Sequence, residues 1–391
     1  MRIPRNRLSA IPAASPLKIL MRNRSDTFTR PGGDTVLLEG LREGLRALGH
    51  TVDVDTGSAL DARHYDIVHL FNLTLPDWIA PHARDAAGKG VPFVIHALQE
   101  DWPRFLNRAL ATAVVLEKYV AAGQPRARLE SSLALLKECP AAAMPLCADA
   151  AKAAAILCTG REEAATVLRD YPSARTRIVP LAAGSSPERD GKGIDEGLQG
   201  GNAEEDFRKV FGLDEFILCV GRLEPRKNQL MLLAALEESE VTVVFADGGF
   251  SYAPEYAEAC RKFSRRGRTV FTGRLASPLL RSAYRSAKVS CLPSWYELPG
   301  LATLESALWG RQVVTTDYGT IRDYLGESCL YAEPDDVRGL AEKISEAWDR
   351  DSGPGDAGLH ARAAAFRWER TVAATEAAYR EALSRRALAG G

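Results

Sequence analysis

Short apolar runs alternate with segments of helical periodicity in residues 17–180. The runs predict buried strands at Leu17–Met21, Thr51–Asp55, Ile67–Phe71, Pro92–His96, Ala155–Thr159 and Thr176–Pro180. Between the first two strands, apolar residues recur at helical spacing over Thr35–Leu48, and Gly49 supplies a stop signal. Because strands separated by helices form parallel βαβ units, this half of the chain predicts an α/β domain.

The second half repeats this rhythm. Strands are predicted at Phe216–Val220, Val241–Phe245, Thr269–Thr272, Lys288–Leu292, Gln312–Thr316 and Cys329–Tyr331, and helices at Gln229–Glu238, Ala253–Lys262 and Pro278–Ser286. The Ala-rich segment Ala141–Ala154 predicts a packed helix or a lid that faces the substrate. Two α/β domains side by side leave a cleft at the carboxyl ends of their strands, where ligands bind in this architecture.

Turn-forming residues crowd into 185–206, which contains several glycines and few large apolar residues, and this composition predicts a linker. The chain is therefore expected to contain an N-terminal tail (1–16), a first domain (17–184), the linker (185–206), a second domain (207–365) and a C-terminal helix (366–391). An apolar stripe predicts that this last helix packs against the domains, and its members are Trp368, Val372, Thr375, Tyr379 and Leu383.

Length and composition fit a two-domain globular protein of 391 residues. A formal net charge of −1 gives no bulk attraction to nucleic acid. The seven cysteines include no CxxC pair, which favours buried thiols in a reducing, cytoplasmic compartment. The sequence shows neither a membrane-spanning apolar run nor a signal peptide. The basic start leaves two alternatives, a disordered tail and peripheral contact with the inner membrane surface.

Two carboxylates flank a predicted strand-to-helix turn in the second half. Glu297 and Glu305 stand eight positions apart, around Pro299-Gly300-Leu301. Free backbone N–H groups at the helix start form an anion site. Carboxylates do not bind phosphate, so we expect them to hold hydroxyl groups beside it. A phosphate flanked by hydroxyl groups is the pattern of a nucleotide sugar.

A basic turn follows the predicted strand Phe216–Val220. Arg222 and Lys227 lie in this turn, where arginine offers bidentate contact to a phosphate and lysine a point charge. The alternative is a solvated basic turn, but the second anion-type helix start near Gly300 favours phosphate binding.

Further candidates lie at other strand ends. The Gly32-Gly33 loop lets backbone amides approach a diphosphate, and the Arg274-Leu275 loop has the position to hold a flat base. His96 ends its strand, either facing the cleft or as a satisfied core histidine. The Asp53-Val54-Asp55 pattern lies inside a strand, so we expect no metal site there. No GxGxxG follows the first strand, which argues against a dinucleotide oxidoreductase.

Together these residues resemble a family 4 glycosyltransferase of the GT-B architecture, as found in bacterial polysaccharide and lipopolysaccharide biosynthesis. The motifs that carry the resemblance are Glu297-x7-Glu305, the basic segment Gly221–Asn228 and Phe366-x-Trp368-Glu369. The resemblance implies two Rossmann-like, doubly wound domains facing across a cleft, an acceptor domain first and a donor domain second. It also implies that the last helix crosses back onto the N-terminal domain. The sequence departs from the family pattern at two places. Leu298 stands where an aromatic residue is usual, and Leu181–Gly184 stands in place of an Asn-Gly turn.

The resemblance also implies residue roles. Arg222 and Lys227 would bind the donor diphosphate, Glu297 the hydroxyls of the donor sugar and Glu305 the ribose, while His96 would face the transferred sugar. The predicted catalytic set is His96, Glu297, Arg222 and Lys227. The predicted donor-binding set comprises Gly32, Gly33, Arg222, Lys227, Arg274, Leu275, Glu297, Pro299, Gly300, Leu301 and Glu305.

The expected function is transfer of a hexose, with retention of configuration, from a nucleotide diphosphate sugar to a carbohydrate or lipid-linked acceptor. Cations and helix starts would neutralise the leaving diphosphate without a metal or cofactor. The alternatives are a sugar-nucleotide epimerase, a sugar phosphorylase on the same scaffold, and a non-catalytic nucleotide-sugar-binding protein.

Overall fold

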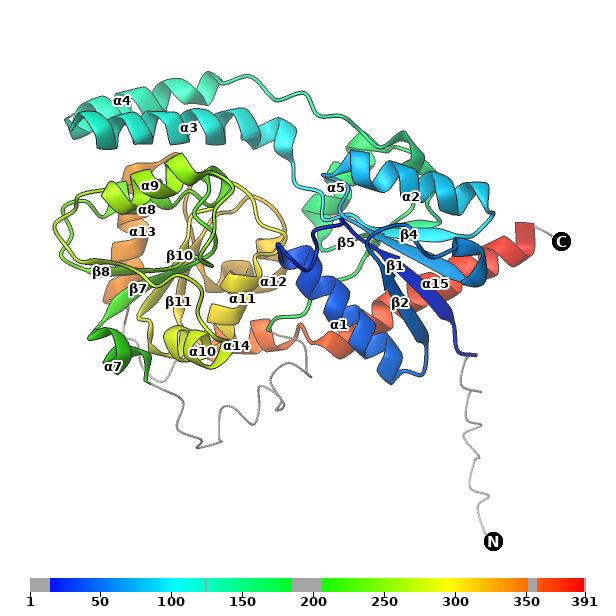
Figure 1. The fold of residues 1–391 in the computed structure, drawn as a ribbon. Helices are drawn as coiled ribbons and strands as arrows, with labels where there is room; N and C mark the ends of the chain where they lie inside the picture. The colour runs from blue at the N-terminus through cyan, green and yellow to red at the C-terminus, as the bar shows by residue number, and fades with distance from the viewer. Residues whose placement is uncertain (1–14, 124, 185–205, 351–356, 390–391) are drawn as a thin grey trace, which may run out of the picture.

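Two parallel six-stranded sheets lie side by side in the computed structural model, which describes residues 15–123, 125–184, 206–350 and 357–389 (Figure 1). The predicted N-terminal tail and linker fall almost wholly outside these residues. One sheet lies within residues 17–184 and the other within residues 207–365. The domain boundaries themselves stay predictions.

The first sheet has the strand order β2-β1-β3-β4-β5-β6. Its strands are β1 (Lys18–Arg22), β2 (Thr51–Asp55), β3 (Ile67–Phe71), β4 (Phe93–His96), β5 (Ala155–Cys158) and β6 (Thr176–Ile178). Successive side chains of a strand point to opposite faces. Ile19 and Met21 therefore pack under helices α1 (Gly33–Ala47) and α15 (Trp368–Ala389), while Leu20 packs under α2 (Pro76–Gly88).

The second sheet has the order β12-β11-β10-β7-β8-β9. Its strands are β7 (Phe216–Val220), β8 (Thr242–Ala246), β9 (Thr269–Phe271), β10 (Val289–Leu292), β11 (Gln312–Thr315) and β12 (Leu330–Tyr331). Counted along the chain from β7, this is the 3-2-1-4-5-6 order of a dinucleotide-binding fold. The strand order reverses between the neighbouring strands β7 and β10. Ligands of such sheets bind outside the carboxyl ends of the strands at this switch point.

Helices cover both faces of each sheet. They are α1 (Gly33–Ala47), α2 (Pro76–Gly88), α3 (Trp102–Ala122), α4 (Arg126–Leu135), α5 (Arg161–Asp170), α7 (Phe207–Phe211), α8 (Gln229–Ala235), α9 (Pro254–Lys262), α10 (Ser277–Ser286), α11 (Leu301–Leu308), α12 (Ile321–Leu325), α13 (Val337–Asp349), α14 (Ala357–Ala364) and α15 (Trp368–Ala389). Short 3₁₀ helices are η1 (Ala62–His64), η2 (Leu136–Glu138), η3 (Ala148–Lys152), η4 (Pro225–Lys227) and η5 (Gly326–Ser328).

Every strand predicted from the apolar runs is present, so the α/β prediction is confirmed. The helix predicted over Ala141–Ala154 is wrong. Residues 139–147 have no regular structure and only Ala148–Lys152 forms a 3₁₀ turn. Pro145 explains this, because proline lacks the N–H that a helix interior needs and disfavours helix at the preceding residue.

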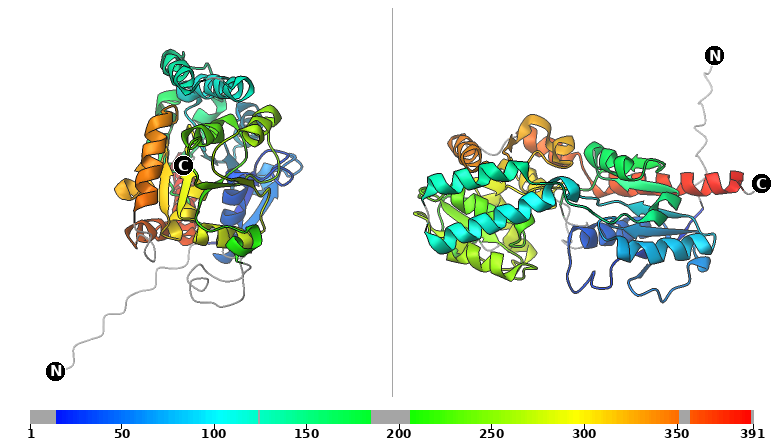
Figure 2. Two further views of the ribbon diagram at one scale, coloured as in Figure 1. Left: turned by 90° about the vertical axis from the view of Figure 1, so that its left-hand side faces the viewer. Right: turned by 90° about the horizontal axis from the view of Figure 1, so that it is seen from above.

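Helices α3 and α4, called the arm below, leave the first sheet and lie over the second (Figures 1 and 2). The sequence analysis did not anticipate them. Leu116 and Leu129 of the arm are buried in one apolar cluster with Leu230 and Met231 of α8. The Tyr119 hydroxyl also donates to Glu237 Oε2 over 2.7 Å. The arm is therefore part of the core of the second domain, although it belongs to the first half of the chain.

Helix α15 runs back along the first sheet, as the resemblance implied (Figure 2). Trp368 and Val372 pack against Gly40 and Gly44 of α1, and a methyl group on either glycine would collide with them. The Thr371 hydroxyl donates to the Pro180 carbonyl over 2.7 Å. The predicted packing role of the apolar stripe is confirmed.

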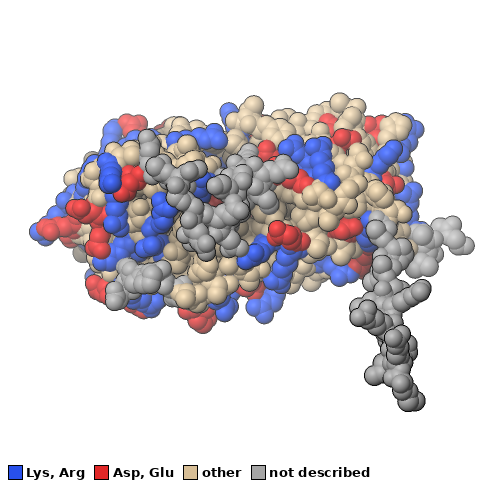
Figure 3. Space-filling view, turned by 90° about the horizontal axis from the view of Figure 1, so that it is seen from below, with Lys and Arg blue, Asp and Glu red and all other residues tan. Residues whose placement is uncertain are grey.

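No helix in the described ranges combines the length and apolarity that crossing a bilayer requires. On the face that Figure 3 shows, lysine and arginine side chains are interspersed with aspartate and glutamate over both halves of the molecule. This mixture matches the net charge near zero.

Candidate functional site

The loops that follow β7 and β10 meet at the switch point of the second sheet. They carry Lys227 and Glu297, whose Nζ and Oε1 atoms lie 2.5 Å apart. The side chains are 14% and 5% exposed, so solvent screens this pair poorly. The sequence placed these residues 70 positions apart, and the parallel pairing of β7 with β10 brings them together.

Glu297 is ionised at this place. Burial raises the pKa of its carboxyl group, but the charges of Lys227 and Arg226 lower the pKa further, and the net shift is downward. A buried carboxylate is tolerated only when cations and hydrogen bonds replace its lost hydration. The pair therefore fixes one negative and one positive group beyond the carboxyl end of β7.

Two glycines shape the backbone around Glu297. Its N–H donates to the Tyr318 carbonyl over 3.1 Å, and its carbonyl accepts from the Thr320 N–H over 2.9 Å. Gly319 lies between these partners with φ +104°, and a Cβ there would collide with the Glu297 carbonyl. Gly300 has φ +80°, and a Cβ there would lie 3.2 Å from Glu297 Oε2. Only glycine fits both places without strain.

Arg222 lies in the loop that follows β7. Its Nε lies 3.4 Å from Glu224 Oε2, and its guanidinium lies over the rings of Phe250 and Tyr252, 5.6 and 5.2 Å from their centroids. Cation–π contact of this kind orients the planar fork without using its outer N–H donors. Arg222 is thus held in place with donors left for an anion.

Arg226, the third cation of the basic turn, has a structural role. Its guanidinium pairs with Glu100 of the first domain at 3.0 Å and donates to the Tyr296 carbonyl over 3.1 Å. The Arg226 carbonyl in turn accepts from the Trp295 N–H over 2.9 Å. Arg226 therefore joins the β7 loop, the β10 loop and the first domain.

The predicted Gly32-Gly33 loop faces this site from the first sheet. A Cβ on Gly32 would lie 3.9 Å from Arg222 Nη1, and a Cβ on Gly33 would lie 3.9 Å from Leu301 Cδ1. The structure thus brings the glycine pair opposite the two predicted donor loops. Asp34, next in the chain, is fixed by Arg24 at 2.8 Å, which braces the loop.

The remaining donor-side residues line the same edge of the second sheet. Glu305, in the second turn of α11, accepts from the Tyr284 hydroxyl over 2.8 Å. Pro299 and Gly300 lead into this helix, with a cis peptide bond before Pro299. Arg274 and Leu275 follow β9, where a Cβ on Gly249 would lie 3.6 Å from the Arg274 backbone nitrogen.

His96 ends β4 and is completely buried. Its Nδ1 atom lies 2.8 Å from His69 Nε2, and His69 Nδ1 lies 2.6 Å from the Tyr379 hydroxyl of α15. Burial lowers the pKa of His96 to about 3. Burial, with a smaller contribution from His96, also lowers the pKa of His69 well below its usual value. Both imidazoles are therefore neutral at neutral pH.

The sequence analysis missed several supporting residues, namely His69, Tyr379, Tyr284 and Gly319. His69 had a visible signal, since it is the single polar residue in the strand Ile67–Phe71. Tyr284 and Gly319 gave none, because their roles depend on loops distant in sequence.

The Asp53-Val54-Asp55 pattern serves the fold of the first domain. Asp53 accepts from the Tyr65 hydroxyl over 2.9 Å. Asp55 accepts the backbone N–H groups of Gly57 and Leu60 over 2.9 and 3.0 Å and lies 3.5 Å from Arg22 Nε. These bonds engage both carboxylates. Within the described ranges, no group of three or more potential ligands has the arrangement of a metal site.

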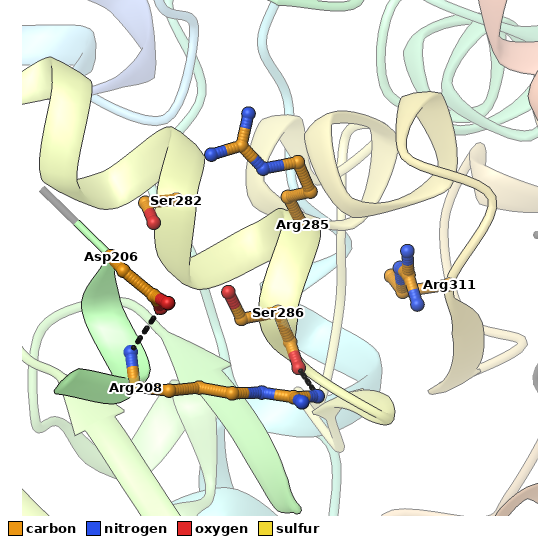
Figure 4. A pocket seen from close by; sticks show the side chains of 6 residues that line it. All are labelled: Asp206, Arg208, Ser282, Arg285, Ser286 and Arg311. Carbon is orange, nitrogen blue, oxygen red and sulfur yellow. Dashed lines mark hydrogen bonds between the residues drawn. The ribbon is translucent and has the colours of Figure 1, made fainter. Parts of the chain in front are cut away.

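A cavity of about 420 Å³ lies at the opposite edge of the second sheet (Figure 4). Its lining residues are Asp206, Arg208, Ser282, Arg285, Ser286 and Arg311. Ser286 and Arg311 precede β10 and β11, so the cavity is at the amino ends of these strands. Arg208 donates to the Ser286 carbonyl over 2.7 Å, while Arg285 extends away from it. None of the predicted site residues lines this cavity.

Comparisons with known proteins find similarity to glycosyltransferases. Residues 214–350 match the family model described as glycosyl transferases group 1. The D-inositol 3-phosphate glycosyltransferase of Mycolicibacterium smegmatis is 28% identical over 202 residues, which cover 49% of this chain and 46% of that protein. The O-antigen chain mannosyltransferase C of Escherichia coli is 30% identical over 152 residues, which cover 37% of this chain and 40% of that protein. The chain thus spans less than half the length of these relatives.

Solved structures extend the likeness to almost the whole chain. Sucrose-phosphate synthase from Thermosynechococcus elongatus aligns with a TM-score of 0.64 at 20% identity, covering 96% of this chain and all of that one. Anabaena HepE in complex with UDP and glucose aligns with a TM-score of 0.62 at 17% identity, covering 92% and 99%. At such identity the likeness concerns the fold, and it confirms the predicted GT-B architecture.

Proposed function

Residues 214–350 form a group 1 glycosyltransferase domain, and from this premise we propose that the whole chain is a retaining glycosyltransferase. It would move a hexose from a nucleotide diphosphate sugar to a carbohydrate or lipid-linked acceptor. One observation carries the proposal. The switch point of the second sheet holds Lys227 paired with Glu297 beside Arg222, and the Gly32-Gly33 loop closes on it from the first sheet.

We assign the diphosphate to the space between Arg222, Lys227 and the start of α11. Arg222 is oriented by its aromatic neighbours, and Lys227 is oriented by Glu297. The N–H groups of a helix start add further positive potential. Gly32 and Gly33 present no side chain, so a diphosphate would fit between the loops. These groups would stabilise the negative charge that develops on the leaving diphosphate.

Glu297 would then hold hydroxyl groups of the sugar. Its ionised carboxylate is an acceptor, and its backbone is fixed on both sides by Tyr318 and Thr320. Glu305 would hold the ribose from the second turn of α11. A fixed sugar exposes one face of its anomeric carbon to the acceptor, and such positioning contributes strongly to catalysis.

Retention follows in this proposal from the leaving group. The departing phosphate oxygen would take the proton of the acceptor hydroxyl on the face that it leaves. The bond between the anomeric carbon and the phosphate oxygen breaks as the bond to the acceptor oxygen forms. His96 would hydrogen-bond to the transferred sugar. The scheme uses no metal, so we expect transfer to proceed unchanged in the presence of EDTA.

The setting of the reaction is part of the proposal. The relatives named as O-antigen mannosyltransferases support an acceptor in polysaccharide or lipopolysaccharide synthesis. Seven unpaired cysteines, six of them buried, support a reducing cytoplasmic location. Peripheral contact with the inner membrane surface, where lipid-linked acceptors reside, stays a proposal.

The first experiment identifies the donor. A thermal-shift panel would compare UDP-glucose, UDP-galactose and GDP-mannose with UDP and GDP. We expect one sugar nucleotide to raise the melting temperature above the value for its parent nucleotide. No shift with any member of a wider panel would contradict the proposed donor class.

The second experiment tests the site. With that donor, Lys227→Ala and Glu297→Ala should each lower transfer by at least about 100-fold, the effect of losing one transition-state contact. Lys262→Ala and Glu258→Ala, which break an exposed ion pair on α9, are matched controls that should keep wild-type rates. Wild-type rates in the site variants would sink the assignment. Product formed without an acceptor would favour an epimerase, and tight donor binding without transfer would favour a binding protein.

A further inference from the structure

A buried hydrogen-bonded chain connects the C-terminal helix with the candidate catalytic histidine. It runs from the Tyr379 hydroxyl to His69 Nδ1 over 2.6 Å, and from His69 Nε2 to His96 Nδ1 over 2.8 Å. The three side chains are completely buried. The rings of His69 and His96 stack at 4.9 Å between centroids, and Phe71 stacks on His69 at 4.3 Å. Packing therefore fixes both rings in orientation.

The direction of the protons in this chain is decided at its tyrosine end. A neutral imidazole carries one N–H and one acceptor nitrogen, so each link has one donor and one acceptor. The Tyr379 hydroxyl has His69 Nδ1 as its one hydrogen-bond partner among the described residues. If His69 donated to Tyr379, the hydroxyl proton and the acceptor nitrogen Nε2 of His96 would both be buried without a partner among the described residues. With the tyrosine as donor, only the Nε2–H of His96 is left unpaired, and each unpaired buried polar group is costly. The tyrosine therefore donates.

The rest of the chain follows from this choice. His69 accepts at Nδ1, so its proton is on Nε2 and is donated to His96 Nδ1. His96 then accepts at Nδ1 and carries its own proton on Nε2. That Nε2 atom is buried and has no hydrogen-bond partner in the described part of the chain. Buried N–H groups are seldom left unpaired, and one at the carboxyl end of a strand is placed to bind a ligand.

We infer that Tyr379 and His69 are positioning residues that hold His96 as a hydrogen-bond donor toward an oxygen of the donor sugar. The inference rests on the proposed function, since it assigns the free N–H of His96 to that substrate. It also gives α15 a role beyond packing. This helix, which begins at Trp368, supplies the group that sets the tautomer of a histidine on β4.

Burial keeps all three groups of the hydrogen-bonded chain uncharged. Both histidines are neutral at neutral pH because of their burial. Tyr379 keeps its proton, because burial raises its pKa well above the usual value. The chain therefore acts through orientation of neutral groups and involves no net proton transfer.

The tautomer can be measured without any substrate. The protein has six histidines, so labelling them with ¹⁵N gives a small set of ring signals in long-range ¹H–¹⁵N correlation spectra. A His96→Gln spectrum assigns the signals of His96. We expect wild-type His96 to carry its proton on Nε2, and the Nε2–H fraction to fall in Tyr379→Phe, which removes only the hydroxyl group.

Tyr171→Phe is the matched control. It removes another buried tyrosine hydroxyl of the first domain, one that accepts from the Cys147 N–H over 3.0 Å and has no link to His96. It should lower stability by a similar amount and leave the His96 tautomer unchanged. A wild-type His96 protonated on Nδ1, or a His96 tautomer unaffected by Tyr379→Phe, would overturn the inference.

Kinetics supply the second readout. Tyr379→Phe should lower kcat by about fivefold, the value of one hydrogen bond, with little change in the KM for donor. His69→Phe should have at least the same effect, while Tyr171→Phe keeps the wild-type kcat. A purely structural role would alter the melting temperature without this separation of kcat from KM. If wild-type protein transfers no sugar, the proposed function fails, while the tautomer measurement still decides whether the chain orients His96.

Discussion

At the scale of single residues, the proposed donor site depends on the ion pair of Lys227 with Glu297. The sequence identified both residues but not their contact, which depends on two loops meeting across 70 positions. Arg226 shows the limit of sequence reasoning most clearly. Arg226 lies beside Lys227 in the same basic turn. Its guanidinium, however, pairs with Glu100 and donates to the Tyr296 carbonyl. Residue type alone did not distinguish a ligand-binding cation from a structural one.

A double-mutant cycle measures the pair. Lys227→Met leaves a buried carboxylate without its nearest cation, so we expect a loss of about 3–5 kcal/mol in the free energy of unfolding. Adding Glu297→Gln removes that carboxylate and should recover most of the loss. Urea unfolding of both single variants and the double variant checks this. Additive losses would show that the two side chains do not interact.

The hydrogen-bonded, completely buried histidines His69 and His96 predict acid sensitivity. Their pKa values are lowered in the folded state and near 6.5 in the unfolded chain, so unfolding takes up protons below pH 6.5. Their contribution to stability is present above pH 6.5. It is lost as the pH falls toward 3, by about 1.4 kcal/mol per pH unit for each histidine. Urea unfolding at pH 7 and pH 5.5 measures the change.

Variants separate this effect from the titration of carboxylates. His69→Phe should reduce the difference in stability between the two pH values by about half of what His69 and His96 contribute together. His64→Gln, at an exposed histidine, is the control and should leave the difference unchanged. An equal pH dependence in His69→Phe and wild type would rule out the explanation.

At the scale of elements, α1 and α15 pack closely because glycines replace side chains between them. Gly40 and Gly44 of α1 receive Trp368 and Val372 of α15. The apolar stripe of α15 was readable from its helical spacing. The face that receives it was not, because a glycine in a helix gives no periodic signal. The Ala141–Ala154 segment shows the opposite error, since its composition favours a helix but Pro145 in its interior prevents one.

Gly44→Ala tests this packing. Its methyl group would overlap with Val372, and such overpacking costs about 1–3 kcal/mol. Gly88→Ala, at the exposed end of α2 with open space around it, is the matched control. It should raise stability by up to about 1 kcal/mol, because alanine is the better helix former. Thermal unfolding of both variants gives the comparison, and a stabilising Gly44→Ala would contradict the packing argument.

At the scale of the whole molecule, the arm makes the two halves interdependent. It belongs to the first half of the chain and is buried in the core of the second. The prediction of two α/β domains was right about the sheets. The resemblance also implied that α15 returns to the first sheet, but nothing in the sequence analysis predicted that the arm covers the second.

Removing buried arm contacts should weaken the second domain. The Leu129 side chain is 2% exposed, so Leu129→Ala leaves a cavity in the core. We expect the free energy of unfolding to fall by about 2–5 kcal/mol. Leu135→Ala, on the same helix but 77% exposed, should change stability by less than about 0.5 kcal/mol. Calorimetry checks both. We expect one transition in wild type and a separate, earlier transition of the second sheet in Leu129→Ala.

The sequence by itself determined the strands, the order of α/β units and the chemical types gathered at the strand ends. Apolar periodicity and turn residues are local signals, so they survive in a single chain without partners. Tertiary structure decided which of these groups act together. The pairing of β7 with β10 joined Lys227 to Glu297, and the return of α15 connected Tyr379 to His96. Lys227 and Glu297 are 70 positions apart and Tyr379 and His69 are 310 positions apart, and such separations leave no trace in local spacing.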